Sequence, residues 1–463
     1  MRQRKSLLSP VGFEPTGVFG EVTLRCRYPV LSYNTTLRFL YGLQRRGMKF
    51  GLRNIRRLLA SVGNPERRFL SIHVGGTNGK GSTSAFLASV FTEAGYKTGL
   101  YTSPHLVRFT ERIRIDGKEM PEERLVEYVR ALRPMVEQTR ATFFEATTCV
   151  AFQYFADEKV DIAIVEVGLG GRLDSTNVIV PLLSVITNVS LEHTEYLGDT
   201  VEKIAREKGG IIKPHAPCVT ASRDDGVVRT LQQIARRRHA PLYQVERRGA
   251  TCVLREKKGT LHVAFTARRL HADNVTLGLA GRYQVVNAAT AFAALDVLIA
   301  DAKFVRRFPL VNVEGVRKGF ERVLANTGLR GRLERVGKNF LLDVAHNADG
   351  MRTLVETLPA RSSKNMIAVF GVLTDKDYAS MCRLLGARVR HVVTVRAHTS
   401  RALPATTLAR EFARCGYRAT PARNVQHGLM IARKLAAPGD TILVTGSHYV
   451  VGEALTLIEQ RNA

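Results

Sequence analysis

The chain has 463 residues, which is too long for one ordinary hydrophobic core, so two or three domains are expected. Its 45% hydrophobic and 24% charged residues are typical of a soluble globular protein, and the apolar runs are too short for a membrane span. The formal charge of +28 leaves open nucleic acid, an anionic membrane or acidic small molecules as partners. Because no zinc finger, aromatic RNP-like strand or basic zipper accompanies the scattered basic residues, we expect a solvated basic surface, with no nucleic-acid or membrane partner.

Two features bear on location and on the start of the chain. The six cysteines have no C-x-x-C pair and no spacing typical of metal ligands, so we expect free thiols in a reducing, cytoplasmic location and no zinc site. These cysteines are Cys26, Cys149, Cys218, Cys252, Cys382 and Cys415. Residues 1–32 have neither helical nor strand periodicity and contain three prolines. This segment is interpreted as a disordered extension or a misplaced start, and it resembles a targeting segment only weakly.

The stretch "HVGGTNGKGSTSAF" (73–86) places four glycines and Lys80 between a buried-strand pattern and a helical pattern. Glycines at such a junction let several backbone N–H groups point at one phosphate, and the helix adds the positive end of its dipole. The generic pattern G-x-x-x-x-G-K-[ST] fails, because Val74 replaces its first glycine and Gly81 separates Lys80 from Ser82. A flexible turn is the alternative for the glycines alone, and the strand–loop–helix order favours a nucleotide site.

From about residue 33 onward, short β-rich runs alternate with helical runs, a pattern that predicts a parallel sheet covered on both faces. The expected strands are 69–74, 97–102, 161–167, 182–189 and 216–221, and the expected helices are 82–94, 122–138, 147–158 and 201–211. Residues 243–279 change to short β-prone pieces that indicate hairpins.

A second alternating series begins near Gly331, with four expected strands at 340–346, 365–372, 391–397 and 440–447. It predicts a separate doubly wound domain, and the glycine-containing segment 324–331 is the predicted linker.

Several polar residues follow these strands at the edge where ligands of open α/β sheets bind. Ser103 is a hydroxyl ligand or a turn former. Glu166, on a strand expected to be buried on both faces, needs magnesium, an arginine or a backbone N–H as a partner. His193 is either structural or, beside the glycine loop and Glu166, a ligand or part of a polar network. Lys208, beside Glu207 on a helix, is by itself interpreted as solvated surface.

The second series offers a similar edge. Asp343, His346 and Asn347 end a strand, where they form either a nucleotide contact or a polar turn. Arg332 lies at the domain junction, where its guanidinium could reach a phosphate across a closing cleft.

Ten motifs occur together in one order from about residue 33 to the C-terminus. They are "GTNGKGS", "YTSPHLVRFTERI", "FEATT", "IVEVGLGGRLDSTNVI", "EHTEYLG", "REKGGIIK", "GRLE", "DVAHNADG", "GVLTDKDY" and "LVTGSHY". With them the chain resembles the folylpolyglutamate synthases and bifunctional dihydrofolate synthases, within the Mur-ligase-like ATP-dependent amide ligases. The resemblance implies an α/β fold, with a P-loop-type ATPase domain and parallel-rich sheet over 33–326 and a smaller C-terminal Rossmann-like domain over 331–463.

The resemblance also implies roles for individual residues. The ATP site comprises Gly79, Lys80, Gly81, Ser82, Asn287, Arg332 and Asp343. Two magnesium ions are held by Ser103 with Glu166 and by His193 with Glu166. Lys208 corresponds to a carbamylated lysine beside the metals, which reverses its surface interpretation, and Lys80, Lys208 and His193 are the catalytic candidates. The substrate contacts are Phe144, Glu145, His346 and Ser447.

The implied activity joins L-glutamate to the carboxylate of dihydropteroate or a folate, with ATP consumed through an acyl phosphate. A monomer is expected. A superfamily ligase acting on a UDP-linked cell-wall precursor is the alternative, and a nucleic-acid-binding protein without catalysis is a further one. Two departures from the family pattern are residues 1–32 and Gly209, where alanine is common.

Overall fold

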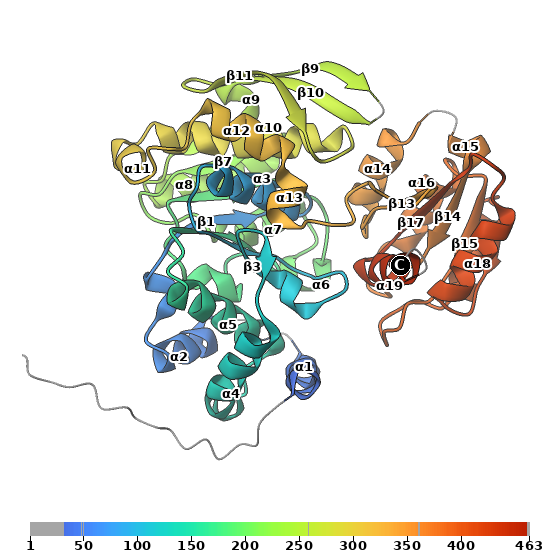
Figure 1. Ribbon diagram of the computed structural model, residues 1–463, viewed down its shortest axis with the longest axis horizontal. Helices are drawn as coiled ribbons and strands as arrows, with labels where there is room; N and C mark the ends of the chain where they lie inside the picture. The colour runs from blue at the N-terminus through green and yellow to red at the C-terminus, as the bar shows by residue number, and fades with distance from the viewer. Residues whose placement is uncertain (1–31, 48, 50, 258, 360–361, 461–463) are drawn as a thin grey trace, which may run out of the picture.

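The computed structural model describes residues 32–460 apart from 48, 50, 258, 360 and 361, and it consists of two α/β bodies (Figure 1). The larger body holds an eight-stranded and a three-stranded sheet, and the smaller body holds a six-stranded sheet. The eight-stranded and six-stranded sheets are parallel-rich, which confirms the predicted fold class, whereas the three-stranded sheet is antiparallel. Except for Ser32, the predicted extension 1–32 lies outside the described residues. None of the helices in the described ranges is long and apolar enough to cross a membrane.

The eight-stranded sheet has the order β4-β3-β2-β5-β1-β6-β7-β8. Its strands are β1 (Leu70–Gly75), β2 (Thr98–Tyr101), β3 (Ile113–Ile115), β4 (Lys118–Glu119), β5 (Ile162–Glu166), β6 (Leu183–Ile186), β7 (Cys218–Thr220) and β8 (Leu242–Gln244). Strands β3 and β4 pair antiparallel at one edge, and the other six run parallel. Val74 lies opposite Glu166, and Gly75 lies opposite Ile186, so the loops after β1, β5 and β6 leave the sheet at one edge.

Helices cover both faces of this sheet, which is why its strands are continuous apolar runs. Between it and the three-stranded sheet lie α3 (Lys80–Glu93), α10 (Tyr283–Ile299), α12 (Val313–Glu321) and α13 (Val323–Thr327). The small sheet consists of β9 (Ala250–Lys257), β10 (Thr260–Thr266) and β11 (His271–Leu277). The other helices of this body are α1 (Tyr33–Gly42), α2 (Arg53–Ser61), α4 (Glu122–Gln138), α5 (Phe143–Asp157), α6 (Thr194–Leu197), α7 (Val201–Gly209), α8 (Asp225–Arg237), α9 (Val245–Arg248) and α11 (Ala302–Arg307). Helix α10 is buried around most of its circumference because it packs between two sheets.

The five strands predicted for the first series, the hairpin region and the helix over 122–138 are confirmed. The helix predicted over 147–158 begins four residues earlier, at Phe143, because Thr142 and Glu145 form a capping box there.

The smaller body has the strand order β12-β13-β17-β14-β15-β16. Its elements are β12 (Glu334–Val336), β13 (Phe340–Leu342), α14 (Ala348–Thr357), α15 (Ser362–Asn365), β14 (Met366–Phe370), α16 (Tyr378–Gly386), β15 (His391–Thr394), α17 (Ala405–Arg414), β16 (Ala419–Pro421), α18 (Val425–Leu435), β17 (Thr441–Thr445) and α19 (His448–Glu459). The four predicted strands are confirmed as β13, β14, β15 and β17, but the prediction missed β12 and β16, which are edge strands of three residues and too short to show periodicity. The predicted linker was partly wrong as well, since α13 includes its first four residues.

Candidate active site

The glycine loop between β1 and α3 has a backbone that only glycine can adopt. Gly76 and Gly79 have φ values of 143° and 84°. A Cβ atom at Gly76 would overlap Thr187 Oγ1, and one at Gly79 would overlap the side-chain oxygen of Asn287. The loop is therefore closely packed against the end of β6 and the start of α10, with Gly79 as the N-cap of α3.

Hydrogen bonds fix this loop in place. The hydroxyl of Thr187 donates to the carbonyl of Asn78 at 2.6 Å, and the Asn78 N–H donates to the Asn188 side chain at 2.7 Å. Lys80 folds back, with Nζ donating to the carbonyls of Gly76 at 3.2 Å and Thr77 at 3.0 Å. The loop thus holds a cation beside its own backbone, an arrangement suited to an anionic ligand.

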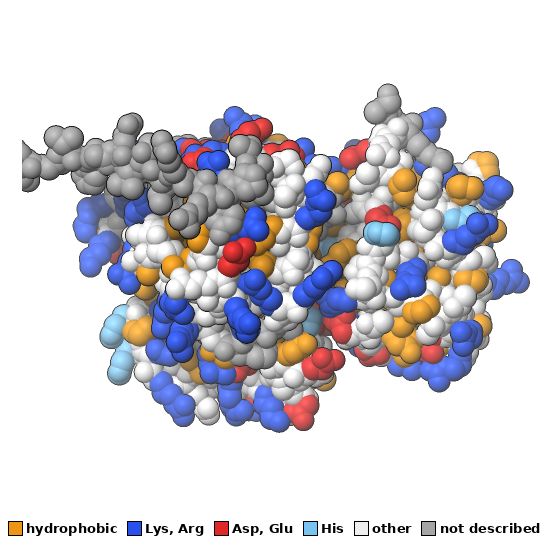
Figure 2. Space-filling model, turned by 90° about the horizontal axis from the view of Figure 1, so that it is seen from below, with side chains coloured by type: hydrophobic (Ala, Val, Ile, Leu, Met, Phe, Trp, Pro, Cys, Tyr) orange, Lys and Arg blue, Asp and Glu red, His pale blue; other side chains and the backbone are white. Residues whose placement is uncertain are grey.

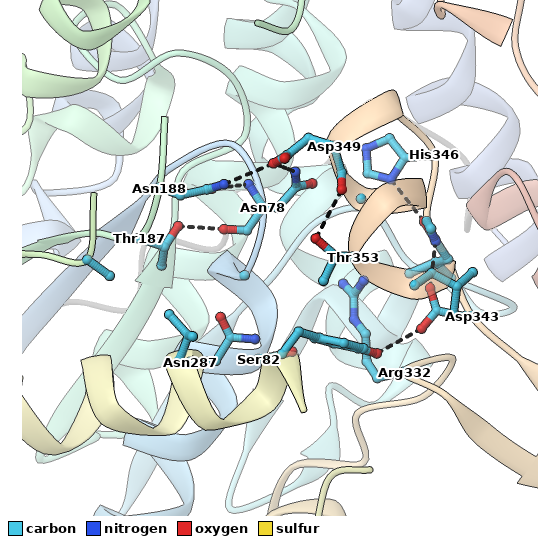
Figure 3. A pocket seen from close by; sticks show the side chains of 18 of the residues that line it. Asn78, Ser82, Thr187, Asn188, Asn287, Arg332, Asp343, His346, Asp349 and Thr353 are labelled. Atoms are coloured by element: carbon cyan, nitrogen blue, oxygen red, sulfur yellow. Dashed lines mark hydrogen bonds between the residues drawn. The ribbon is translucent and has the colours of Figure 1, made fainter. Parts of the chain in front are cut away.

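A cavity of about 220 Å³ lies between the two bodies, directly beside the loop (Figure 3). The larger body contributes Gly79, Ser82 and Asn287, and the smaller body contributes Asp343 and His346 across the gap. Arg332 also lines it, and the Arg332 Nε atom is buried without a hydrogen-bond partner in the part of the chain that the structure describes. These six residues, expected to be together from the sequence, are brought together here.

Asp343 is held firmly on the far side of this cavity. Its carboxylate accepts hydrogen bonds from the Tyr283 hydroxyl at 2.8 Å, the Leu333 N–H at 3.0 Å and the Ala345 N–H at 2.9 Å. Burial raises the pKa of this carboxyl, and the Arg332 guanidinium opposes the shift. Asp343 is thus a fixed acceptor at the point where the smaller body meets α10.

A second cavity of about 150 Å³ adjoins the first and is more polar. Nine residues that the sequence had singled out line it: the candidate metal and catalytic residues Lys80, Ser103, Glu166, His193 and Lys208, together with Gly79, Gly81, Arg332 and His346. Glu166 accepts the Ser103 backbone N–H at 3.0 Å, and burial raises its pKa although Lys80 opposes the shift. Burial lowers the pKa of His193 to about 4, and Lys376 adds to the effect. His193 is therefore neutral near pH 7 and able to act as a ligand.

Lys208 is buried in this cavity, which overturns its interpretation as surface. Its Nζ donates to the Gly76 carbonyl at 2.7 Å. Lys208 therefore contacts the glycine loop, residues 76–79, which is called the phosphate loop below after its predicted role. Burial, with a contribution from Lys80, lowers the pKa of Lys208 to about 7. A large fraction of this amine is consequently neutral near physiological pH.

The donor set fits magnesium only in combination with other ligands. The described residues contain no group of three or more His, Cys, Asp and Glu side chains arranged to hold a metal. Magnesium usually takes one or two protein ligands and completes its octahedron with water and substrate phosphate. Glu166 and His193 at one cavity beside the phosphate loop are compatible with that mode.

Sequence reasoning missed an ionic contact that joins the two bodies. The Glu192 carboxylate lies 3.3 Å from Lys376 Nζ and 3.4 Å from His346 Nε2, and it accepts a hydrogen bond from Asn347 Nδ2 at 3.0 Å. Burial opposes ionisation of Glu192, but His346 and Lys376 outweigh it and lower the pKa. Glu192 and Lys376 occur in the motifs "EHTEYLG" and "GVLTDKDY", the signals that could have identified them.

Asp349, in the first turn of α14, makes a second contact across the gap. One carboxylate oxygen accepts from Asn78 Nδ2 at 2.9 Å, Asn188 Nδ2 at 3.1 Å and Ser190 Oγ at 3.2 Å. Figure 3 shows Asp349 reaching toward Asn78 and Asn188. The phosphate loop is therefore tied directly to the smaller body.

Three of the four expected substrate contacts lie outside the residues that line these cavities. The Glu145 carboxylate is 2% exposed and accepts the Thr142 N–H at 2.7 Å as part of the capping box of α5. Ser447 caps α19 and accepts the Val450 N–H at 3.2 Å. The Phe144 ring packs against Gly168 and lies 6.1 Å from the ring of Tyr101. Only His346 of the four lines both cavities.

Comparisons with known proteins agree with this arrangement. The Mur ligase middle domain matches residues 74–295, and the Mur ligase glutamate ligase domain matches residues 331–448. The dihydrofolate synthase/folylpolyglutamate synthase of Bacillus subtilis is 34% identical, over 91% of this chain and 98% of the relative. The folylpolyglutamate synthase of Lacticaseibacillus casei is 33% identical, over 91% of this chain and 97% of the relative.

Solved structures share the fold over nearly the whole chain. Escherichia coli FolC in complex with DHPP and ADP has a TM-score of 0.81 at 30% identity, covering 94% of this chain and 99% of its own. Mycobacterium tuberculosis folylpolyglutamate synthase complexed with ADP has a TM-score of 0.82 at 31% identity, covering 92% and 99%. The Yersinia pestis bifunctional enzyme, complexed with AMPPNP and a Mn ion, has a TM-score of 0.79 at 28% identity, covering 93% and 98%. These relatives favour the folate branch over the cell-wall alternative, and this chain belongs to the dihydrofolate synthase/folylpolyglutamate synthase family of ATP-dependent Mur-type ligases.

Proposed function

We propose that this enzyme uses ATP and magnesium to join the amino group of L-glutamate to the carboxylate of dihydropteroate, of a folate, or of both. The observation that carries the proposal is the geometry of the two cavities. They share Asn78, Gly79, Arg332 and His346, so a nucleotide in the first cavity would extend its phosphates into the second. The buried polar groups of the second cavity then surround the reacting end.

The first step activates the acceptor. Its carboxylate oxygen attacks the γ-phosphorus of ATP, the bond to the β-phosphate oxygen breaks, and an acyl phosphate and ADP result. Carboxylate and triphosphate repel each other, and Lys80 and Arg332 supply positive charge to offset that repulsion. When bound, magnesium would add further positive charge at the phosphates, held by Glu166, His193 and the Ser103 hydroxyl.

In the second step the amino group of L-glutamate attacks the acyl carbon, and the tetrahedral intermediate expels phosphate as the amide forms. The ammonium of glutamate first loses one proton to water, and the second proton, which leaves the nitrogen as the amide forms, is taken up by the expelled phosphate. The contacts of Glu192 and Asp349 across the gap keep the bodies closed, which limits hydrolysis of the acyl phosphate. We place the glutamate on the side of the smaller body, near His346.

Lys208 is the proposed site of carbamylation. Its neutral amine would attack carbon dioxide, forming an N–C bond and releasing one proton, and the product is an anion beside the magnesium ligands. The lowered pKa and the burial of Lys208 support this assignment, because the reaction requires an uncharged amine. The second magnesium ion would then gain an oxygen ligand that the unmodified side chains lack.

A cytoplasmic monomer is part of the proposal. The location is supported by the free cysteines of the described part of the chain, of which Cys149, Cys218 and Cys382 are buried, a state maintained in a reducing compartment.

The proposal is tested by following labelled L-glutamate into 7,8-dihydropteroate and, separately, into tetrahydrofolate, with ATP, magnesium and bicarbonate. Incorporation into both acceptors would establish a bifunctional enzyme, and incorporation into one would define its branch. Glu166→Gln is expected to lose at least about a hundredfold in turnover, because it removes a carboxylate beside the phosphates. Incorporation into neither acceptor, with turnover of a UDP-linked precursor instead, would overturn the proposal.

A further inference from the structure

A basic pocket in the smaller body is not used by the proposed chemistry. Its volume is about 400 Å³, and it lies beside the loop that follows β15. The pocket is lined by Arg396, Ala397, His398, Thr399, Ser400, Arg423, Asn424 and Glu453. It is one of several basic regions, since Lys and Arg side chains are spread over both bodies on the face shown in Figure 2.

The positive charge of this pocket is only partly offset by the protein, because one acid, Glu453, lines it together with Arg396 and Arg423. Arg396 and Arg423 are both exposed, and within the described ranges their guanidinium groups have neither an ion pair nor a hydrogen-bond partner. The one acid of the pocket, Glu453, accepts the backbone N–H of His398 and so holds the loop. Two free guanidinium groups and two residues with hydroxyls, Thr399 and Ser400, therefore line one hollow, a donor set that matches carboxylates.

The position of the pocket relates it to the active site. Strands β13, β14, β15 and β17 run parallel, so the loop after β15 leaves the same edge of the sheet as Asp343 and His448. Helix α19 begins at His448, which lines the second cavity, and reaches Glu453 five residues later, about 7.5 Å along its axis. Tyr449, 42% exposed, lies one turn before Glu453 on the same face of the helix. The pocket and the second cavity therefore lie at the same edge of the sheet and are joined by the first turns of α19.

We propose that this pocket binds the glutamate tail of acceptors that have already been extended, an inference that rests on the proposed function. In a γ-linked tail each residue keeps a free α-carboxylate, and only the terminal γ-carboxylate reacts. From standard bond lengths each γ-glutamyl unit spans roughly 6 Å, so two units exceed the rise of about 7.5 Å from His448 to Glu453 along α19. Extended acceptors consequently bind through Arg396 and Arg423, and a monoglutamate does not reach them.

The test compares KM for the monoglutamate and tetraglutamate forms of the accepted folate. In the double variant Arg396→Ala/Arg423→Ala, KM for the tetraglutamate is expected to rise about tenfold, with kcat and the monoglutamate KM unchanged. The double variant Arg396→Lys/Arg423→Lys keeps the charge but loses the bidentate geometry, so an intermediate KM is expected. Added salt should reduce the difference between wild type and the alanine variant.

The chain offers a matched control. Arg247 and Arg268 are also exposed, have no ion-pair or hydrogen-bond partner in the described part of the chain, and line a pocket of about 400 Å³ beside β8 in the larger body. Arg247→Ala/Arg268→Ala removes the same charge, and both KM values are expected to stay at the wild-type level. If the tetraglutamate KM rose equally in this control, the change in KM would be explained by the loss of net charge alone, and the inference would be overturned.

The inference also fails if the alanine variant at Arg396 and Arg423 keeps the wild-type ratio of the two KM values. Calorimetric titration with free tetra-γ-glutamate separates this failure from failure of the proposed function, because it needs no turnover. If tetra-γ-glutamate binds the wild type but not the alanine variant, the pocket is supported as a tail-binding site even if the enzyme extends no folate. Absent or equal binding in both proteins overturns it.

Discussion

Replacing Asp349 by alanine tests whether the contacts between the two bodies hold the active site closed. The Asp349 carboxylate oxygen accepts three hydrogen bonds from the larger body, the shortest being 2.9 Å from Asn78 Nδ2. The alanine variant removes the acceptor and leaves the donors facing the gap. The phosphate loop then loses its most direct connection to the smaller body.

The expected magnitude follows from the charge on the acceptor. A hydrogen bond to a charged group contributes about 1.5–3 kcal/mol, and three donors sharing one oxygen do not add fully. We therefore expect a loss of about 3 kcal/mol in the free energy that favours closure, or about a hundredfold in the closing equilibrium. Asp349→Asn keeps an acceptor oxygen without the charge, so about half of that loss is expected.

Two measurements check this prediction. Steady-state kinetics should show a lower kcat/KM for ATP in the order wild type, Asp349→Asn, Asp349→Ala, and small-angle scattering should show a larger radius of gyration in the same order. Arg352→Ala is the control, because Arg352 is 58% exposed and lies 3.8 Å from the other Asp349 oxygen, so its removal should have little effect.

Equal scattering and kinetics for wild type and Asp349→Ala would refute the reasoning, as would an equal loss in Arg352→Ala. Because Asp349 also lies in the first turn of α14, its removal costs up to about 1 kcal/mol of helix stabilisation. A free energy of unfolding lowered by much more than that would show that the fold, rather than closure, had been disturbed.

Three further predictions concern single side chains. Gly79→Ala forces a Cβ into Asn287 at a φ of 84°, so the KM for ATP is expected to rise at least about tenfold in steady-state assays, and an unchanged KM would contradict the described loop. Burial and nearby arginines lower the pKa of Lys213 to about 8. Between pH 8 and 10.5 the amine is therefore protonated in the unfolded chain but not in the folded chain, so the free energy of unfolding rises with pH. The wild type should therefore gain on the order of 1–2 kcal/mol over Lys213→Met across that range in urea unfolding, after allowance for partial exposure, and a constant difference would disprove the shift. Glu145→Ala should lower the free energy of unfolding by about 1 kcal/mol and leave the KM for the acceptor unchanged. Glu145→Gln keeps the capping box, so its stability should stay near that of the wild type. A raised acceptor KM in both variants would instead show that Glu145 contacts the substrate.

The sequence by itself determined the features that depend on neighbouring residues. The glycine loop before Lys80 could be recognised because a strand, a tight turn and a helix leave a local pattern within about fifteen residues. The α/β alternation, the break in character near residue 243 and the second series after Gly331 are patterns of the same kind. The strand patterns placed Ser103, Glu166 and His193 at or after strand ends, the motif resemblance gave them a metal-binding role, and the structure brings these residues to one cavity.

Tertiary structure alone decided what lies between distant segments. Asp349 meets Asn78 across 271 positions of the chain, and Glu192 meets Lys376 across 184, so no local periodicity could indicate either contact. Lys208 has the spacing of a surface residue, and its burial depends on how α7 packs behind the phosphate loop. These outcomes depend on the free energy of packing whole elements against one another, which is shared among many residues and leaves no pattern within a single segment.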